Sequence, residues 1–315
     1  MSKRVLVTGG AGFIGSHVAD LYLAHGWEVT VLDNLSSGRR ENIPAAARFV
    51  ECGVNDPEAR ALLADGEFTV LNHHAAQMDV RVSVADPLFD ARVNIAGLIN
   101  LLEGATRGGV ERVVFASSGG VVYGESDALP HLETAPKLPV SPYGVSKLAS
   151  EYYLAMYAQL HELEVVPLRY ANVYGPRQNP HGEAGVVAIF CDRILKGDSL
   201  TVFGDGAQTR DYVFVGDVAR ANLAATTGKL GALKSIDDVA FNVGTGVETS
   251  VTELARGLLA VAGSDVAVEH APARPGELQR SAVDPAKLAS VWAWEPEIGL
   301  AEGLQRTYDW IATNQ

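Results

Sequence analysis

The chain has 315 residues, of which 47% are hydrophobic and 20% charged, a composition typical of a globular protein with a substantial core. Its formal net charge of −13 argues against a nucleic-acid-binding surface, which is usually basic. Apolar runs are too short for a secretion signal or a membrane span, and the only cysteines, Cys52 and Cys191, suggest neither a disulfide framework nor a metal site. We therefore expect a cytoplasmic protein with no nucleic-acid, membrane or metal partner.

The N-terminal stretch has the pattern of a strand, a glycine-rich turn, a helix and a second strand. The strands are expected at residues 5–8 and 28–32, the helix at 16–25, and the turn carries glycines at positions 9, 12 and 15. Small residues at this spacing allow a tight turn, let backbone N–H groups approach a pyrophosphate and let the helix pack close to the sheet. The strand before, the helix after and an acid behind together favour dinucleotide binding over a purely structural turn.

Asp33 ends the second predicted strand, 24 residues after Gly9. A carboxylate at this position accepts hydrogen bonds from the hydroxyls of the adenosine ribose and repels a 2′-phosphate, so the sequence predicts NAD rather than NADP as the cofactor. Arg39 and Arg40 follow closely and offer the alternative, because arginines there are able to bind a 2′-phosphate. We interpret them as exposed loop charges as long as Asp33 is present.

Strands and helices continue to alternate, which predicts an α/β fold with a Rossmann-type doubly wound parallel sheet. Further strands are expected at 48–51, 69–73, 112–116 and 165–170, and helices at 57–63 and 87–102. The pair His73-His74 ends a strand without any matching metal-ligand spacing, so we expect it to line the cofactor cleft. Asn94 is either a solvated surface residue or a donor behind the site, and the sequence leaves both open.

Residues 141–147 predict a helix that carries the chemistry. Ser141 suits the N-cap and Pro142 the first helical position, so Tyr143 and Lys147 then share one helical face. A tyrosine pKa is ordinarily about 10, so a phenolate at neutral pH requires roughly 4 kcal/mol of preference for the ionised form. A neighbouring ammonium supplies much of that preference, because opposite charge favours ionisation. The spacing alone would arise by chance often enough, but the glycine-rich turn gives it weight.

Beyond residue 170 the alternation becomes irregular. Helices are expected at 182–196, 217–226, 253–262 and 300–312, a short helix from 285, and strands at 212–215 and 241–243. We expect a smaller α/β lobe that closes over the carboxyl ends of the sheet and binds the substrate. The expected division gives residues 1–170 and roughly 212–244 to the NAD-binding domain, and 171–211 and 245–315 to the lobe.

These motifs, in this order, resemble the extended short-chain dehydrogenase/reductase family, and within it the UDP-glucose 4-epimerase group. The segments that carry the resemblance are 8–16, 33–35, 117–118 before 122–124, 143–147, 169–177, 182–190, 204–206, 210–212 and 274–277. The family implies reversible C4 epimerisation of a UDP-hexose, UDP-glucose and UDP-galactose above all, through a transient 4-keto sugar and bound NADH. It also implies a homodimer, formed by the helices at 87–102 and 143–161.

The resemblance assigns roles to individual residues. The catalytic residues that it implies are Tyr143, Lys147 and Ser118. The implied cofactor contacts are Gly9, Gly12, Phe13, Ile14, Asp33, Asn34, Asp56, His74, Ala75, Ala76, Asn94, Ser117, Tyr143, Lys147 and Tyr170. The implied substrate contacts are Ser118, Tyr143, Asn172, Val186, Val187, Arg210, Arg274 and Ser281.

The sequence departs from the family in three places, one of which is Met78, where some epimerases have a lysine near the cofactor pyrophosphate. The segment before 122–124 is one residue out of step, so Ser118 is assigned as the catalytic hydroxyl and Ser117 is its alternative. Gly53 stands where relatives often have an aspartate for the adenine amino group, so that contact is either missing or moved to Asp56.

The two arginines assigned to the substrate have a structural alternative, and the assignment of Ser281 has a consequence for specificity. Arg210 and Arg274 either grip the substrate diphosphate or form ion pairs with Asp211 and Glu277, and the acidity of the chain favours the diphosphate. Ser281 is small where the family limits the space around the sugar C2 substituent, so N-acetylhexosamines are expected to fit as well.

Other functions remain as alternatives. A UDP-uronic acid 4-epimerase, or another nucleotide-sugar oxidoreductase of the same family, would need a cation for the sugar carboxylate. A catalytically idle NAD-binding sensor would not need the Tyr143, Lys147 and Ser118 set. A dehydratase is disfavoured by the same resemblance. The dehydratases of this family need an acid in the segment before 122–124, and residues 117–120 contain none.

Overall fold

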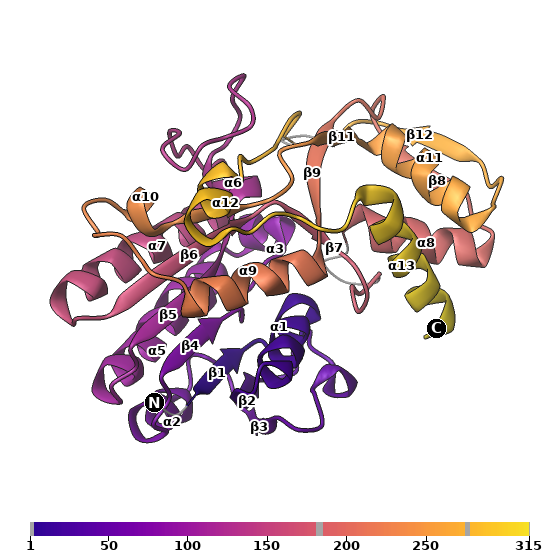
Figure 1. Ribbon diagram of the computed structural model, residues 1–315. Helices are drawn as coiled ribbons and strands as arrows, with labels where there is room; N and C mark the ends of the chain where they lie inside the picture. The colour runs from indigo at the N-terminus through magenta and orange to yellow at the C-terminus, as the bar shows by residue number, and fades with distance from the viewer. Residues whose placement is uncertain (1–2, 181–184, 275–277, 315) are drawn as a thin grey trace.

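A seven-stranded parallel sheet forms the centre of the computed structural model, which describes residues 3–180, 185–274 and 278–314 (Figure 1). The strands are β1 (Arg4–Thr8), β2 (Glu28–Asp33), β3 (Arg48–Glu51), β4 (Val70–His73), β5 (Arg112–Ser118), β6 (Glu164–Tyr170) and β10 (Phe241–Val243). Their order across the sheet is β10-β6-β5-β4-β1-β2-β3. The order changes direction beside β1, which confirms the predicted doubly wound arrangement and marks the edge where such sheets bind ligands.

Helices cover both faces of this sheet. One face carries α2 (Pro57–Asp65), α5 (Gly97–Arg107) and α7 (Pro142–Leu160), and the other carries α1 (Phe13–Ala24) and α9 (Val215–Thr227). Leu6 packs toward α2 and α5, whereas its neighbours Val5 and Val7 pack toward α1. Neighbouring strand residues point to opposite faces, so these strands must be apolar throughout.

Several short elements differ from the prediction. The helix predicted at 87–102 consists of α4 (Pro87–Ala91), a π-helical turn η2 (Arg92–Ala96) and α5, and the unpredicted α3 (Val80–Ala85) precedes it. The remaining short helices are η1 (Arg40–Asn42), α6 (Gly119–Val122), α10 (Ile236–Val239) and α12 (Ala286–Trp292).

A second group of elements lies beyond the carboxyl ends of the large sheet (Figure 1). Its sheets are β11 (Glu248–Ser250), β9 (Thr209–Phe214) and β7 (Asn172–Tyr174), and separately β12 (Val268–Ala271) and β8 (Leu200–Phe203). Its helices are α8 (Val186–Lys196), α11 (Val251–Ala262) and α13 (Leu300–Thr313). They enclose a core of their own around Phe190 and Leu254. Residues 182–184 of the predicted 182–196 helix lie outside the described residues.

The turn between β1 and α1 is tight enough to require glycine. Gly9 has a φ of +69°, and a Cβ there would lie 2.6 Å from the backbone nitrogen of Ala75. A Cβ on Gly15 would lie 2.3 Å from the carbonyl oxygen of Gly9. Helix α1 begins at Phe13, earlier than predicted, so Gly15 lies inside it and lets it approach the turn.

Two histidines close the end of β4. His73 is buried with its Nδ1 2.6 Å from Thr8 Oγ1, and the His74 ring stacks on that of Tyr170 at 6.2 Å between centroids. Burial lowers the pKa of His73 well below its usual value and that of His74 to about 3, and the nearby charge of Lys147 acts in the same direction. Both rings are therefore neutral in the folded protein at neutral pH.

Replacing Gly15 with alanine should lower the thermal unfolding temperature, because the new methyl group meets backbone atoms that no side-chain movement can clear. Overpacking of this kind costs about 1–3 kcal/mol. Gly231→Ala is the matched control, since nothing lies within 4 Å of its Cβ position. Calorimetry that finds Gly15→Ala as stable as the parent would contradict the close packing of this turn.

Stability against urea should fall as the pH is lowered from about 6.5 toward 4, because the unfolded chain then protonates histidines that the folded chain keeps neutral. Each such histidine contributes a slope of about 1.4 kcal/mol per pH unit. His74→Asn should remove one such contribution. Identical slopes for the parent and His74→Asn would show that His74 is not held neutral.

Candidate active site

Helix α7 delivers two of the predicted catalytic side chains to the carboxyl edge of the sheet. Ser141 caps the helix, since its Oγ accepts from the backbone N–H of Gly144 at 3.1 Å, and Pro142 is in the first turn, as predicted. Lys147 is buried and donates to the carbonyl oxygen of Ala116 at 2.8 Å. Its Nζ lies 5.7 Å from the ring centroid of the half-buried Tyr143. The phenol and the ammonium therefore share one side of α7 next to the end of β5.

The charge of Lys147 is under opposing influences. Burial lowers the pKa of Lys147 to about 8, while the carboxylates of Asp90 and Glu151 act to raise it. The ring of Phe115 covers the ammonium at 4.7 Å from its centroid. The ammonium form thus persists at neutral pH in a buried environment, where its field on a neighbouring phenol is strong.

The two serines at the end of β5 point to opposite faces of the sheet. Ser117 is buried and donates from its Oγ to Glu151 at 2.5 Å. Ser118 is half-buried, and its Oγ and the Oδ1 of Asn172 each lie 3.8 Å from the Cβ position of Gly120. The structure therefore brings together Ser118 and Asn172, both predicted to contact the substrate, and occupies Ser117 within the protein. This geometry favours Ser118 over its alternative.

The turn after β1 fits a dinucleotide. Gly12 is the N-cap of α1 and provides no side-chain hydrogen bond, so no side chain caps the first N–H groups of the helix, around Phe13 and Ile14. N–H groups of this kind bind a pyrophosphate. Asp33 is buried and accepts from the backbone of Ala11 and Leu35 at 3.0 and 2.8 Å. Burial raises the pKa of Asp33, and these two hydrogen bonds oppose the rise.

Several other predicted cofactor contacts line the same edge. The Nε2 of His74 is buried and makes no hydrogen bond of good geometry with the described residues, although Asn222 lies close enough to raise the pKa of the ring. Ala75 donates to Thr8 Oγ1 at 3.3 Å and is followed by the half-buried Ala76. The Tyr170 hydroxyl is instead bonded to Asn222, so only its ring is presented to His74.

The polar residues near the predicted adenosine site form ion pairs or hydrogen bonds within the protein. Arg40 pairs with Glu51, Arg39 lies 3.8 Å from Glu41, and both are exposed, which agrees with their interpretation as loop charges. Asn34 is exposed and accepts from the backbone of Ser36 at 3.1 Å.

Asp56 lies beside Gly53. Relatives in the resembled family often have an aspartate at the position of Gly53. The backbone N–H of Gly53 donates to Asp56 Oδ2 at 2.6 Å. A Cβ on Gly53 would lie 3.1 Å from the same oxygen. The carboxylate of Asp56 is therefore close to the place that the missing side chain would enter.

Asn94 is buried, so the solvated alternative is wrong. Its Oδ1 accepts from the backbone N–H of Gln77 at 2.9 Å, and its Nδ2 donates to the carbonyl of Gln77 at 2.8 Å and to Asp90 Oδ1 at 3.0 Å. Asn94 thus fixes the chain that follows β4, as expected for a donor behind the site.

The lobe contributes the remaining predicted contacts. The guanidinium of the exposed Arg274 stacks on Phe203 at 3.8 Å, and Arg210 lies on β9 with Nη1 donating to the carbonyl of Thr209. The carboxylate of the neighbouring Asp211 is buried among backbone and hydroxyl donors of residues 245–246, and Glu277 lies outside the described residues.

Three further predicted substrate contacts are less open. Val186 is half-buried at the start of α8, whereas the side chain of Val187 belongs to the core of the lobe. Ser281 is buried, and its carbonyl oxygen accepts from the backbone N–H of Asp211 at 3.0 Å.

Buried charges behind the site were not predicted. Asp90, Glu151 and Arg169 are fully buried. Asp90 and Glu151 act on the charge of Lys147, and Glu151 accepts from both Ser117 and Arg169. Glu151 had a detectable signal, since it lies four residues after Lys147 on the same helical face. Arg169 and Asp90 come from other elements, and no local pattern pairs them with α7.

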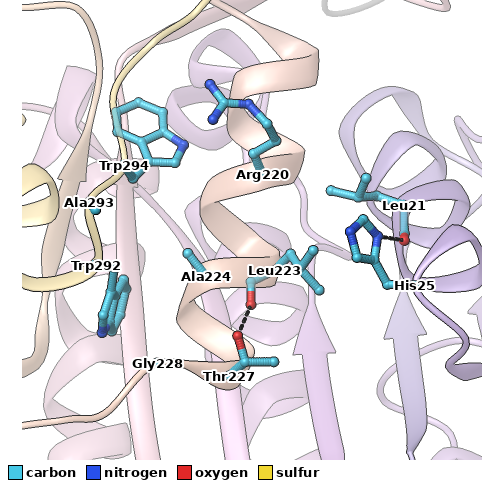
Figure 2. A pocket seen from close by; sticks show the side chains of 10 residues that line it. All are labelled: Leu21, His25, Arg220, Leu223, Ala224, Thr227, Gly228, Trp292, Ala293 and Trp294. Atoms are coloured by element: carbon cyan, nitrogen blue, oxygen red, sulfur yellow. Dashed lines mark hydrogen bonds between the residues drawn. The ribbon is translucent and has the colours of Figure 1, made fainter.

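A pocket of about 460 Å³ lies away from these residues, between α1, α9 and the segment after α12 (Figure 2). None of the predicted site residues lines it. Its polar groups are satisfied internally, because the indole nitrogens of Trp292 and Trp294 donate to backbone carbonyls and Arg220 pairs with Asp217 and Glu297. We interpret it as a surface hollow of the fold.

The described residues contain neither a membrane-spanning helix nor a cluster of metal ligands. No helix there combines the length and apolarity needed to cross a membrane. No three His, Cys, Asp or Glu side chains within residues 3–180, 185–274 and 278–314 form a group that would hold a metal ion.

Comparison with known proteins places the chain in a family. The sequence model described as the NAD dependent epimerase/dehydratase family matches residues 5–244. The UDP-glucose 4-epimerase of Mycolicibacterium smegmatis is 46% identical over 313 residues, which cover 98% of either chain. The structure of the Thermotoga maritima UDP-glucose 4-epimerase with UDP-glucose matches with a TM-score of 0.94 and 43% identity over 99% of either chain. The Thermus thermophilus UDP-glucose 4-epimerase complexed with NAD matches with a TM-score of 0.90 and 48% identity over 98% of either chain. The chain therefore belongs to the NAD dependent epimerase/dehydratase family.

Proposed function

We propose that the protein interconverts UDP-glucose and UDP-galactose by epimerisation at C4. The observation that carries this proposal is the placement of Tyr143 and the buried ammonium of Lys147 at the sheet edge that also presents Ser118 and Asn172. Full-length similarity to UDP-glucose 4-epimerases, one of which was crystallised with UDP-glucose, supports it. Bound NAD supplies a site that accepts a hydride from C4 and returns it.

The side chains act on the proton and on position. Tyr143 takes the proton of the sugar 4-hydroxyl as C4 is oxidised, and gives it back when C4 is reduced. Ser118 holds the same oxygen. Lys147 favours the phenolate and, with one N–H on Ala116, keeps two N–H groups for ribose hydroxyls.

Epimerisation requires the 4-keto sugar to turn while the nucleotide stays bound. Arg210 and Arg274 are proposed to hold the diphosphate, because a guanidinium fork matches phosphate oxygens. Asn172 and the backbone near Val186 and Val187 would hold the uridine end. The small Ser281 is proposed to leave space at C2, so that N-acetylhexosamines enter the same pocket.

The two separate hydrophobic cores support a division of the chain into a cofactor domain and a substrate lobe. Residues 1–170 and roughly 212–244 are proposed as the cofactor domain, and 171–211 and 245–315 as the lobe that binds the nucleotide sugar. The pairing of β10 with β6 supports the return of the chain to the first domain.

A homodimer is proposed from the exposed apolar side chains on neighbouring helices. The residues concerned are Val84 on α3, Leu88 and Phe89 on α4, and Tyr152 and Leu160 on α7, with exposed fractions of 64, 75, 42, 60 and 66%. Exposed apolar side chains on helices that pack against one another favour burial against a partner. A second copy is the proposed partner, because paired copies of these helices would form a compact bundle.

Turnover of UDP-glucose tests the proposed function. Tyr143→Phe should lower kcat by about 10²–10⁴-fold, the usual contribution of an acid–base group, while NAD and UDP-glucose still bind. Tyr153→Phe, on the same helix, is the control and should keep the parental kcat. Equal kcat in Tyr143→Phe and the parent would refute the catalytic assignment.

The same assay decides between substrates. Turnover of UDP-N-acetylglucosamine is expected, and its absence beside active UDP-glucose turnover would refute the role of Ser281 alone. Turnover of a UDP-uronic acid in place of UDP-glucose would favour the alternative epimerase, and binding without any turnover would favour a sensor.

Sedimentation velocity tests the dimer. The parent should sediment as twice the mass of one chain, and the double variant Leu88→Glu/Tyr152→Glu as a single chain, because each copy would bury charges without partners. Val247→Glu introduces the same charge at another exposed apolar site and should remain dimeric. A monomeric parent would contradict the proposal.

A further inference from the structure

A cluster of buried charges lies directly behind Ser117 and Lys147, and the proposed function gives it no role. The Arg169 and Glu151 side chains have no exposed surface, and their closest approach is 2.6 Å between Nη2 and Oε2. A buried ion pair is weak support for stability, because the cost of removing both charges from water can exceed the attraction between them. Its position next to the candidate catalytic residues therefore suggests another role.

Glu151 connects three elements of the site. It lies four residues after Lys147 and eight after Tyr143, so the three side chains follow one stripe of α7. Its Oε1 accepts from Ser117 at 2.5 Å, at the end of β5. Its two oxygens also accept from the Nε of Arg169 at 3.0 and 3.2 Å. The carboxylate is thus held at a fixed place between α7, β5 and β6.

Arg169 is itself held on several sides. Its Nη1 donates to the Tyr123 hydroxyl at 3.0 Å and to the carbonyl of Glu133 at 2.9 Å. Its Nη2 donates to Asp237 Oδ1 at 2.9 Å, in addition to Glu151. A guanidinium fixed in this way cannot turn from the carboxylate, so it clamps Glu151 in one orientation.

Lys147 is the group that this carboxylate faces along α7. The charged and titratable groups around the ammonium are Asp90 from α4, Glu151 and Tyr143 from α7, and His73 and His74 from the end of β4. Among the residues that the structure describes, Asp90 and Glu151 oppose the effect of burial on the pKa of Lys147. Asp90 is in turn fixed by donors from Gln77, Asn94 and Ser146.

We propose that Glu151 is a positioning residue for the reaction: its carboxylate, clamped by Arg169, balances the buried charge of Lys147 and fixes Ser117 at the end of β5. This role rests on the proposed function, but its effect on Lys147 is a property of the protein alone. Loss of the carboxylate removes one of the two charges that keep Lys147 protonated. Because the ammonium that favours the phenolate then loses its proton at lower pH, the alkaline side of the pH–rate profile moves to lower pH.

The test compares Glu151→Gln with two further variants. The titration of Lys147 is followed by NMR of the lysine side chains in the purified protein, with the Lys147 signal identified by its loss in Lys147→Arg. In Glu151→Gln the titration should move to lower pH, the kcat/KM profile for UDP-glucose should move with it, and kcat should fall about tenfold or more through misplacement. Glu133→Gln also removes a buried carboxylate beside Arg169, and it should leave the Lys147 titration in place.

A double variant separates positioning from folding. Glu151→Gln/Arg169→Met removes both buried charges and should regain thermal stability, and it should keep the direction of the Lys147 shift, because Glu151 lies one helical turn from Lys147 on α7 whereas Arg169 lies behind it on β6. It carries the test if Glu151→Gln does not fold. A parental Lys147 titration and parental pH–rate profile in either variant would overturn the proposal. A shifted titration in a protein that does not turn over UDP-glucose would refute the proposed function and leave the control of Lys147 by Glu151 standing.

Discussion

Burying the ammonium of Lys147 carries a free-energy cost that its neighbours must offset. The carbonyl of Ala116 accepts one of its protons, and the carboxylates of Asp90 and Glu151 oppose the effect of burial. Once the ammonium is fixed there, Tyr143 lies one turn earlier on α7 at the same sheet edge. In the proposed reaction, the substrate oxygen lies between this phenol and Ser118. The geometry of the site thus depends on the one buried position where the ammonium of Lys147 is stabilised by its neighbours.

The two sides of the site differ in physical character, and the proposed reaction needs that difference. The sheet side consists of buried groups that satisfy one another, such as Ser117 with Glu151 and Asn94 with Gln77. The lobe side presents Arg274 at the surface, stacked on an aromatic ring. Rigid groups hold the proton-transfer geometry, whereas an exposed cation is able to grip a diphosphate while the sugar beyond it turns.

The sequence predicted the parts of the fold that local chemistry decides. The glycine-rich turn, the cap formed by Ser141 and Pro142, and the strands of the large sheet all follow from short patterns. The predicted start of helix α1 is too late, because the glycine pattern assigns Gly15 to the turn whereas it lies inside the helix. Strands β8 and β12 pair only with each other across a long stretch of chain, so neither has a local signal.

The candidate site shows the same limit. The spacing of Tyr143 and Lys147 predicts that they share one helical face. The partners of Glu151 and Asp90 come from other elements, so no local sequence pattern indicates them. A crystal structure with NAD and UDP-glucose bound tests the central claim most directly. The account predicts the Tyr143 hydroxyl within hydrogen-bond distance of the sugar 4-hydroxyl, with Lys147 still buried on Ala116. A nucleotide sugar bound with its C4 turned away from Tyr143, or Lys147 displaced into solvent, would contradict it.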